Sequence, residues 1–238
     1  MFGPLRCAEC QSSHPVAEGV VELVLERESP AGLQRGLELR WVARSWERYL
    51  RPAVSVAVTR RRFDRDSEYL LLRSLLGTPD APVLDLGCGT GLFARRLARE
   101  PAMPPVVGMD VARAMLEESV AQAREARVRV DFVHAAAPEL PFLDGSLGGV
   151  LHSDALHLVE DAARLFVEVS RVLRPGGRYV ATTYLPPGFP AAFVHRQVGL
   201  HPRTEVELRA ALTAAGLVRF ERMLLPPFIV VKAEKPTA

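Results

Sequence analysis

A short apolar segment that breaks into alternating glycines constrains this chain more than any other feature. Residues 83–86 read Val-Leu-Asp-Leu, the next five read Gly-Cys-Gly-Thr-Gly, and a helical pattern runs from Leu92 to Glu100. Glycine is favoured where a strand turns sharply into a helix and where the backbone comes close to a ligand. The pattern therefore predicts a strand, a tight turn and a helix that together hold a nucleotide-like cofactor.

The spacing of the glycines indicates which kind of cofactor this turn would hold. A dinucleotide-binding turn follows G-x-G-x-x-G and places a pyrophosphate at the helix N-terminus. Here the glycines are Gly87, Gly89 and Gly91, and Asp85 lies two residues before the first of them. This pattern favours a ligand without a pyrophosphate, and S-adenosylmethionine fits, with Asp85 near its ammonium group, directly or through water. Asp110, at the end of the next apolar run, can accept both ribose hydroxyls.

Strands and helices are expected to alternate from residue 82 onward. We expect strands at 82–86, 105–109, 129–133, 147–152 and 177–183, helices at 90–100, 112–125 and 161–173, and then a helix at 204–215 with strands at 217–224 and 227–234. Such alternation predicts a parallel sheet with helices on both faces. In a sheet of this kind the ligand binds beyond the carboxyl ends of the strands.

Four segments carry a resemblance to a known family. They read VLDLGCGTG (83–91), VVGMD (106–110) with Ala-Met-Leu shortly after it, PELPFLDGSLGGVLHSDALHLVED (138–161) and VSRVLRPGGRYVATT (169–183). The chain resembles the class I S-adenosylmethionine-dependent methyltransferases, in particular the subgroup that includes the ubiquinone and menaquinone biosynthesis methyltransferases, over about 150 of its 238 residues. The resemblance implies an α/β fold that is Rossmann-like and doubly wound. Its mostly parallel seven-stranded sheet would have an antiparallel last strand.

The resemblance and the predicted strand ends also assign site residues. Those expected at the cofactor are Asp85, Gly87, Cys88, Gly89, Gly91, Asp110, Val111, Met115, Ala136, Ala137 and Ser153. Methyl transfer is a direct displacement at a sulfonium methyl group, so a general base is needed only if the acceptor loses a proton. The candidates for that base are His152, Asp154 and His157, near the end of the fourth strand.

Two positions depart from the family pattern. The family usually has Asp-Ala where this chain has Ala136-Ala137, so the carboxylate that would bind the adenine edge is missing and only backbone amides remain. The family often has an acidic residue at the position of Gly148. We expect cofactor binding to survive both changes, because most of the expected contacts are made by the backbone.

Length and composition agree with a globular enzyme. The chain has 238 residues, of which 48% are hydrophobic and 24% charged, an ordinary balance for one domain with a small addition. No apolar run reaches the roughly 18 residues of a membrane-spanning helix, and the N-terminus lacks the pattern of a secretory signal. A cytoplasmic location is therefore expected. The net charge of +2 is too small to predict nucleic-acid binding over the whole surface.

The chain is expected to have three parts. They are a small appendage at 1–30, a helical cap segment at 31–76 and the cofactor-binding domain at 77–238, which contains the loop 184–203. This loop is long enough to act as a lid, and a hydrophobic connection packed on the sheet edge is the alternative.

Arginines are concentrated in the cap segment. Between residues 34 and 66, nine arginines stand against four acids, interleaved with Trp41, Trp46 and Tyr49. Arginines beside aromatic side chains can stack on bases or hold an anionic substrate. The alternative is a solvated helix face. The sequence leaves both interpretations open.

A C-x-x-C pattern lies in the appendage, which also has a predicted strand from Val20 to Leu25. Cys7-Ala8-Glu9-Cys10 and the residues after it resemble the second half of a small zinc ribbon found ahead of some methyltransferases. A structural zinc needs four ligands, and the first C-x-x-C is absent. We expect a degenerate ribbon without metal. Zinc completed by His14 and an outside ligand, or shared by two chains in a dimer, stays open.

These observations together predict an enzyme that transfers a methyl group from S-adenosylmethionine to a small or lipid-like acceptor. The first alternative is an RNA base methyltransferase that uses the arginine-rich segment. The second is a binding module that keeps the cofactor fold without turnover, which the changes at Ala136 and Gly148 would permit.

Overall fold

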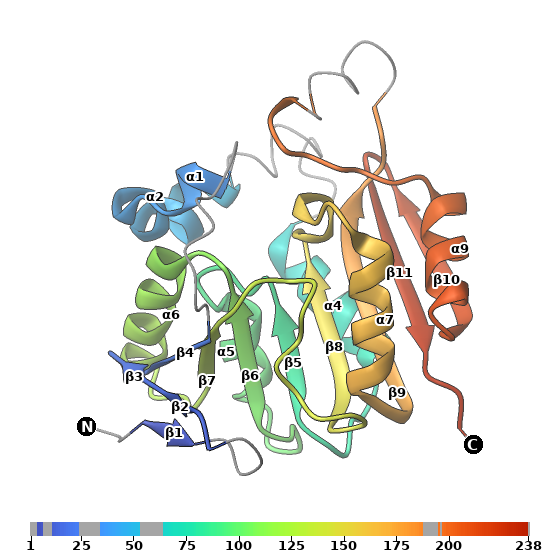
Figure 1. Ribbon diagram of the computed structural model, residues 1–238. Helices are drawn as coiled ribbons and strands as arrows, with labels where there is room; N and C mark the ends of the chain where they lie inside the picture. The colour runs from blue at the N-terminus through green and yellow to red at the C-terminus, as the bar shows by residue number, and fades with distance from the viewer. Residues whose placement is uncertain are drawn as a thin grey trace.

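A mostly parallel sheet lies at the centre of the structure, a computed structural model that describes residues 4–6, 11–23, 34–52, 64–187, 195 and 197–237 (Figure 1). The strands lie in the order β10-β11-β9-β8-β5-β6-β7-β4-β3. They are β3 (Val16–Ala17), β4 (Val20–Glu22), β5 (Val83–Leu86), β6 (Val106–Asp110), β7 (Asp131–His134), β8 (Leu147–Ser153), β9 (Leu173–Tyr184), β10 (Val218–Leu225) and β11 (Phe228–Glu234).

Seven of these strands form the sheet that the sequence predicts. β5 pairs in parallel with β6 on one side and with β8 on the other, and β11 runs antiparallel to both β9 and β10. Every residue of β5 is buried, as expected for a central strand that is covered on both faces. The fold class and the antiparallel last strand are confirmed. The strand order reverses at β5, because β6 lies on one side of it and β8 on the other. In sheets of this kind the ligand binds at that reversal point, at the carboxyl ends of the strands.

Helices cover both faces of the sheet. They are α1 (Gln34–Leu37), α2 (Arg40–Ser45), the π-helix η1 (Trp46–Leu50), α4 (Arg65–Leu76), α5 (Leu92–Leu97), α6 (Arg113–Glu125), the 3₁₀-helix η2 (Leu156–Leu158), α7 (Ala162–Val172) and α9 (Glu205–Ala214). α4 and α5 pack on one face through Leu72 and Phe93. α7 and α9 pack on the other through Phe166 and Leu208. Apolar side chains that alternate along β5 supply both cores.

The N-terminal segment differs from the separate appendage that the sequence predicts. β3 and β4 extend the central sheet to nine strands, and β4 pairs in parallel with β7. Val20 is fully buried against Leu116, Val120 and Phe132, so β4 covers the edge of β7 that would otherwise be exposed. The predicted strand at 20–25 is β4, which spans Val20–Glu22, and residues 24 and 25 lie outside the described part of the chain. β1 (Leu5–Arg6) and β2 (Ser13–His14) form a separate antiparallel pair.

Some predicted segments fall partly outside the described residues. The cap segment is helical at 34–37, 40–52 and 65–76, and 53–63 lie outside. Of the predicted lid, residues 188–194 and 196 lie outside, and so do Cys7 and Cys10.

Candidate functional site

The glycine turn after β5 adopts a backbone that favours glycine at all three of its glycine positions. Gly87, Gly89 and Gly91 have φ angles of 66°, 54° and 75°. A Cβ atom on Gly87 would lie 2.6 Å from the Cβ of Ala155, whereas a Cβ on Gly89 would meet no atom nearer than 4.0 Å, the Nε1 of Trp46. The turn is therefore packed against the end of β8 at Gly87 and open at Gly89. Backbone open in this way can contact a ligand directly.

Asp110 joins the turn to the next strand. Its two carboxylate oxygens accept the backbone N–H groups of Gly89 at 2.7 Å and Ala112 at 2.8 Å. Burial raises the pKa of this carboxyl group, and the amides of Ala112 and Gly89 act in the opposite direction. Each oxygen retains a lone pair, because a carboxylate oxygen accepts more than one hydrogen bond. Asp110 is thus held in a fixed position and can still accept hydroxyl groups, as the prediction requires.

Asp85 of β5 is a buried carboxylate. Its carboxylate is only 2% exposed and accepts the amide of Ala94 in the first turn of α5 at 2.9 Å. Burial raises its pKa to about 7, against the lowering effect of that hydrogen bond. The structure therefore places Asp85 inside the protein, where it fixes the start of α5 relative to β5. A direct contact of this buried side chain with the ammonium group of a cofactor is disfavoured, and the contact through water stays a prediction.

The remaining predicted cofactor residues contribute backbone more than side chain. The Cys88 thiol packs inward, 3.0 Å from the position that a Cβ on Gly108 would take, and burial raises its pKa. Met115 is 1% exposed and packs beneath the cap helices. Val111 is exposed, and its carbonyl accepts a hydrogen bond from the His134 ring. These positions shape the site without offering a side-chain polar group to it.

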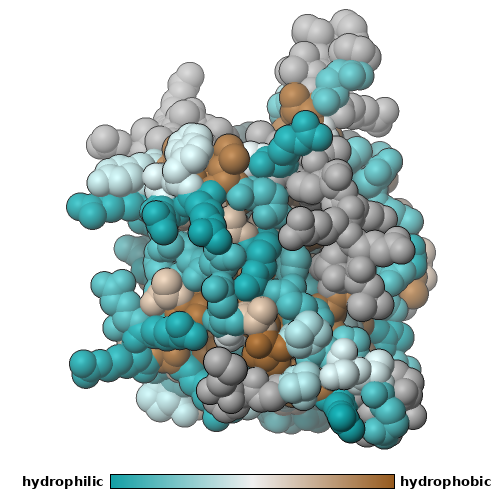
Figure 2. All heavy atoms as spheres, turned by 60° about the vertical axis from the view of Figure 1, so that its left-hand side comes forward, coloured by the Kyte–Doolittle hydropathy of each residue, from teal (hydrophilic) through white to brown (hydrophobic). Residues whose placement is uncertain are grey.

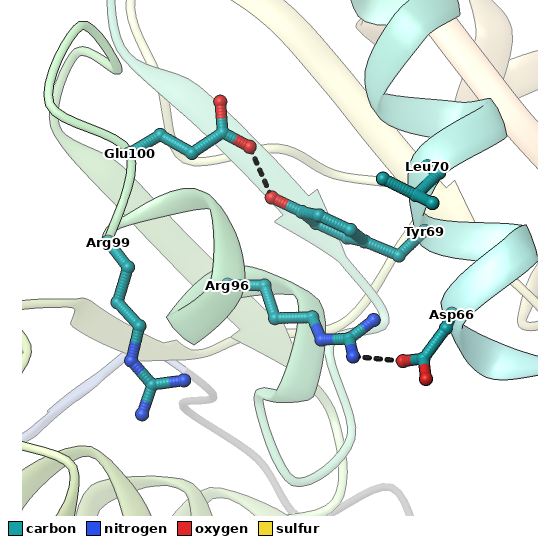
Figure 3. A pocket seen from close by; sticks show the side chains of 6 residues that line it. All are labelled: Asp66, Tyr69, Leu70, Arg96, Arg99 and Glu100. Atoms are coloured by element: carbon teal, nitrogen blue, oxygen red, sulfur yellow. Dashed lines mark hydrogen bonds and ion pairs between the residues drawn. The ribbon is translucent and has the colours of Figure 1, made fainter.

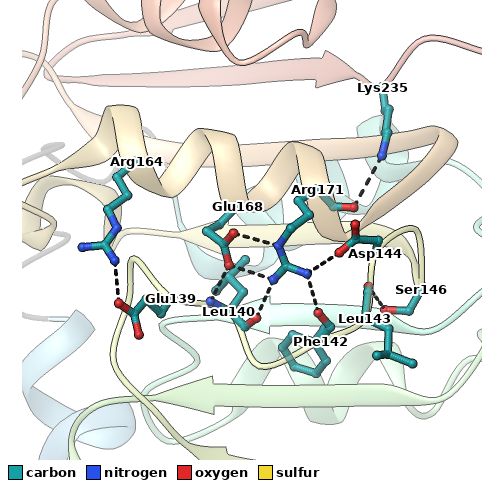
Figure 4. A network of polar contacts seen from close by, with 10 residues as sticks. All are labelled: Glu139, Leu140, Phe142, Leu143, Asp144, Ser146, Arg164, Glu168, Arg171 and Lys235. Atoms are coloured by element: carbon teal, nitrogen blue, oxygen red, sulfur yellow. Dashed lines mark hydrogen bonds and ion pairs between the residues drawn. The ribbon is translucent and has the colours of Figure 1, made fainter. Parts of the chain in front are cut away.

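Ala136 and Ala137 begin a loop that an arginine fixes to α7. Figure 4 shows the Arg171 guanidinium between this loop and the helix. It donates to the carbonyls of Phe142 and Leu140, each at 2.8 Å, and binds Glu168 and Asp144 at 2.7 Å. Ala136 is exposed at the carboxyl end of β7. The loop is therefore held in place while its first residues remain accessible.

Gly148, where the family often has an acid, has no room for a side chain. A Cβ there would lie 2.7 Å from the carbonyl oxygen and 2.9 Å from the nitrogen of Ala81. Backbone atoms cannot move aside as the end of a side chain can. The departure from the family pattern at this position therefore reflects close packing at the start of β8, far along the strand from the site.

Residues 34–52, which we call the cap helices, lie over the turn. Val42 and Ala43 are buried against Ala112, Ala114 and Met115, with Trp46 and Leu50 at the margin of the same cluster. The π-helical turn η1 follows directly. Such turns are uncommon and are often found at functional sites.

Glu47 of η1 binds the cap helices to the turn. Its carboxylate accepts the Thr90 hydroxyl at 2.5 Å and the Arg95 guanidinium at 2.9 Å. The Arg95 and Glu47 side chains are only 6% and 15% exposed, so this is a buried ion pair. Sequence reasoning missed Glu47 and Arg95, because a single acid in an arginine-rich helix gives no sign of its partner.

A second buried ion pair joins the cap helices to the end of β8. Arg51 donates to Glu68 of α4 at 3.3 Å and to the Ser153 hydroxyl at 3.1 Å, and Ser153 donates to Glu68 at 2.7 Å. The Arg51 guanidinium also lies 5.0 Å from the centre of the Phe93 ring. Ser153, predicted to contact the cofactor, thus has its hydroxyl committed to these two charged groups.

Two buried side-chain atoms that follow Ser153 in the sequence have no hydrogen-bond partner among the described residues. The Oδ1 of Asp154 and the Nδ1 of His157 are buried and make no hydrogen bond there. Asp154 has a φ of 54°, an uncommon backbone conformation for a residue other than glycine. Burial raises its pKa to about 7, although Arg51 acts in the opposite direction. An unpaired buried polar atom is costly unless a ligand or water satisfies it.

His157 faces Tyr184 across this region. Their rings lie edge to face with centres 4.6 Å apart. Burial lowers the pKa of His157 to about 4, and His195 acts in the same direction. His157 is therefore neutral at neutral pH, and its Nδ1 can donate or accept a hydrogen bond.

His152, the third predicted base, belongs to the core. It is 1% exposed, and its Nδ1 lies 3.1 Å from the Tyr179 hydroxyl. Burial lowers its pKa to about 3. Its Nε2 lies 3.7 Å from the position that a Cβ on Gly87 would take, so the ring packs beneath the glycine turn. Burial and a low pKa make His152 less suited than Asp154 to act as a base.

A surface pocket of about 430 Å³ lies between α4 and α5 (Figure 3). Tyr69 donates to Glu100 at 2.5 Å, and Arg96 pairs with Asp66. These polar groups satisfy one another, and the pocket lies on the outer side of helices that cover the sheet. It is separate from the carboxyl ends of the strands, where the predicted residues meet.

The described residues contain no group of three or more His, Cys, Asp or Glu side chains placed to hold a metal ion. Within the same part of the chain, no helix is long and apolar enough to span a membrane.

The match to a family model agrees with this geometry. Residues 84–181 match the model described as a methyltransferase domain. The mostly parallel sheet with helices on both faces is a fold that this chain shares with solved methyltransferases. A solved structure with the same fold is the geranyl diphosphate C-methyltransferase from Streptomyces coelicolor, with a TM-score of 0.64 and 21% identity over 71% of this chain and 76% of that one.

Curated relatives carry methyltransferase names. An uncharacterized chloroplastic methyltransferase from Arabidopsis thaliana is 33% identical over 171 residues, which cover 65% of this chain and 48% of that protein. The ubiquinone/menaquinone biosynthesis C-methyltransferase of Desulfotalea psychrophila is 41% identical over 112 residues, 47% of this chain and 45% of that protein. The chain thus spans about half the length of these relatives.

Proposed function

We propose that this protein is an S-adenosylmethionine-dependent methyltransferase that acts on a small or lipid-like acceptor. The observation that carries the proposal is the Asp110 carboxylate, fixed by the amides of Gly89 and Ala112 beside an open glycine turn. The matched methyltransferase domain supports it. So do relatives named for a quinone and for geranyl diphosphate.

The residues present fit this cofactor. Asp110 retains lone pairs for the two ribose hydroxyls, and the backbone around Gly89 is open for the amino-acid tail. The exposed start of the loop at Ala136 offers backbone amides to the adenine. The cofactor supplies an electrophilic methyl group and leaves as a neutral thioether. No pyrophosphate is needed, which agrees with a turn that lacks the third dinucleotide glycine.

Asp154 is the residue we assign as general base. The bound cofactor would supply the methyl group, and the acceptor atom that receives it would give up a proton. The proton that the acceptor loses passes to the unpartnered Oδ1 of Asp154. A base is most effective when its pKa lies near the working pH, and burial raises the pKa of Asp154 to about 7.

His157 and Tyr184 act with Asp154 by orienting the acceptor. The neutral His157 ring offers its buried Nδ1, and the edge-to-face contact with Tyr184 holds the ring in place. His157 is less suited to take the proton, because burial lowers its pKa to about 4. Because the acceptor would lose a proton to Asp154, we expect it to carry an acidic hydroxyl group, or a carbon atom that a neighbouring hydroxyl group makes acidic.

The experiment starts with the cofactor and then looks for the acceptor. Calorimetry should detect binding of S-adenosylmethionine and no binding of a pyridine dinucleotide. The protein is then incubated with methyl-labelled cofactor and a fractionated cell extract. We expect label in lipid or small solutes. Label in RNA would support the alternative RNA methyltransferase, and tight binding with no transfer would support a non-catalytic module.

The proposal includes a cytoplasmic location and an appendage without metal. Zinc analysis of the chain purified without a histidine tag tests the second point. A stoichiometric zinc signal would show that Cys7 and Cys10 bind metal, and sedimentation of that sample would show whether two chains share it.

A further inference from the structure

The outer face of the cap helices is unusual in its composition. Its exposed residues are Arg35, Leu39, Arg40, Trp41, Arg44, Arg48 and Tyr49. Trp41, Tyr49 and Leu39 are 64%, 60% and 46% exposed. Four of the seven residues are cationic, three are large and apolar, and none is acidic. We call this set the outer cap face.

The fold does not account for these apolar side chains. The opposite side of the same helix already buries Val42 and Ala43 against α6. Figure 2, in which the side of the molecule that carries the cap comes forward, shows pale and brown side chains among teal ones near its upper edge. A helix that is apolar on its inner side and also on part of its outer side has a second apolar surface, and here packing among the described residues leaves much of that surface exposed.

The charges on this face are only partly neutralised. Arg40 pairs with Glu117 at 3.3 Å, yet its side chain remains 73% exposed. Glu38 lies nearby and is half-buried. Glu47 is turned inward to Arg95, so it does not offset the outer arginines. The outer cap face therefore has a positive charge that complements an anionic partner.

We infer that the outer cap face binds the surface of a membrane that contains anionic phospholipids. Tryptophan and tyrosine favour the headgroup region, leucine enters the acyl boundary, and arginine binds phosphate while its stem lies along apolar groups. RNA is less well matched, because Leu39 cannot stack on a base. In addition, the Arg48 guanidinium already lies 5.4 Å from the Tyr49 ring centre.

Membrane binding extends the proposed function, and it rests on that function only for the route by which the acceptor reaches the site. A lipid-like acceptor would reach the site from a membrane held against the cap helices, which cover the glycine turn. Membrane binding itself requires neither cofactor nor acceptor. A vesicle-binding measurement therefore fails or succeeds independently of methyl transfer.

Cosedimentation of the full chain with lipid vesicles tests the inference. Vesicles of phosphatidylcholine alone are compared with vesicles that contain roughly one third phosphatidylglycerol. We expect binding to the anionic vesicles that weakens with salt. The double variant Trp41→Ser/Tyr49→Ser should lower the partition coefficient about tenfold. Arg44→Gln/Arg48→Gln should remove the difference between the two kinds of vesicle.

The matched control changes an equally exposed pair on α9. Val206 is 76% exposed, and Val206→Ser/Arg209→Gln should bind vesicles as the unaltered chain does. Trp41 and Trp46 are the chain's 2 tryptophans, so Trp46→Phe leaves Trp41 as the single tryptophan, whose emission can be excited selectively. Its emission should shift to shorter wavelength with anionic vesicles. Absence of binding, equal loss in the α9 control, or retention of single-stranded RNA but not of vesicles would overturn the inference.

Discussion

The two halves of the site differ in how their polar groups are satisfied. In the proposed cofactor half, formed by the turn 87–91 with Asp110, the carboxylate accepts the backbone amides of Gly89 and Ala112. In the acceptor half, formed by Asp154, His157 and Tyr184, the Asp154 Oδ1 and the His157 Nδ1 have no partner among the described residues.

This difference separates a preformed site from an incomplete one. The cofactor half is held by hydrogen bonds that exist without a ligand, so the turn and Asp110 themselves need little rearrangement once the cap helices admit the cofactor. The acceptor half contains buried polar atoms without hydrogen-bond partners, which lower the stability of the fold. A bound molecule that made hydrogen bonds to them would remove this penalty. The comparison therefore predicts that variants of the two halves separate into effects on cofactor affinity and effects on turnover.

Asp154→Asn tests the acceptor half and should have the largest effect. The amide cannot take a proton, so we expect kcat to fall by about 10²- to 10⁴-fold while cofactor affinity stays the same. In the unaltered enzyme the rate should rise with pH through about 7, because the pKa of Asp154 is raised to about 7 and only the ionised carboxylate is a base. Steady-state rates from acidic to alkaline pH check both points. A pH profile shared by the two proteins would remove Asp154 as the base.

Asp110→Ala tests the cofactor half. Loss of two hydrogen bonds to the ribose, at about 1.5 kcal/mol or more each, should weaken cofactor binding about a hundredfold. Calorimetry measures the change, and Asp110→Asn, which keeps the size of the side chain, should lose less. Affinity equal to that of the unaltered chain would show that the ribose is bound elsewhere.

Substitution of two glycines distinguishes packing from backbone conformation within the turn. Gly87→Ala places a Cβ 2.6 Å from that of Ala155, whereas Gly89→Ala meets no atom nearer than 4.0 Å. Both have positive φ, so each should lose about 1 kcal/mol of stability, and Gly87→Ala about 1–3 kcal/mol more. Chemical unfolding gives the values. Adding Ala155→Gly should recover part of the larger loss, and equal losses for the two glycines would contradict the packing argument.

Ser119→Ala should have the smallest effect. The Ser119 hydroxyl lies 2.8 Å from the carbonyl oxygen of Gly89 and 2.9 Å from that of Met115, and it is fully buried. Its removal should cost about 1 kcal/mol of stability and weaken cofactor binding only slightly. Thermal unfolding and calorimetry measure the two effects. A loss of affinity as large as that of Asp110→Ala would mean that the carbonyl of Gly89, rather than the carboxylate, controls binding.

The sequence predicts the sheet and the turn well because both depend on local pattern. Apolar runs of strand length and glycines at 87, 89 and 91 leave few alternatives for β5 and the helix after it. The position of Asp110 beside the turn could be predicted, because this residue ends the next strand and the carboxyl ends of parallel strands meet at the same edge of the sheet.

Side-chain direction and long-range partners could not be predicted in the same way. Asp85 and His152 each lie inside the protein, and whether a strand residue faces the core or the site depends on how many layers cover that face. The ion pair of Glu47 with Arg95 spans 48 positions and requires the cap helices to fold back on the turn. Likewise, β4 pairs with β7 across more than a hundred residues, which no local pattern encodes.

The cap helices are bound to both halves, through Glu47 to the turn and through Arg51 to Ser153. Any movement that uncovers the site must break a buried ion pair at each of these places, and separating such pairs is energetically expensive. We therefore expect exchange of spent cofactor, rather than the displacement reaction, to limit the catalytic cycle.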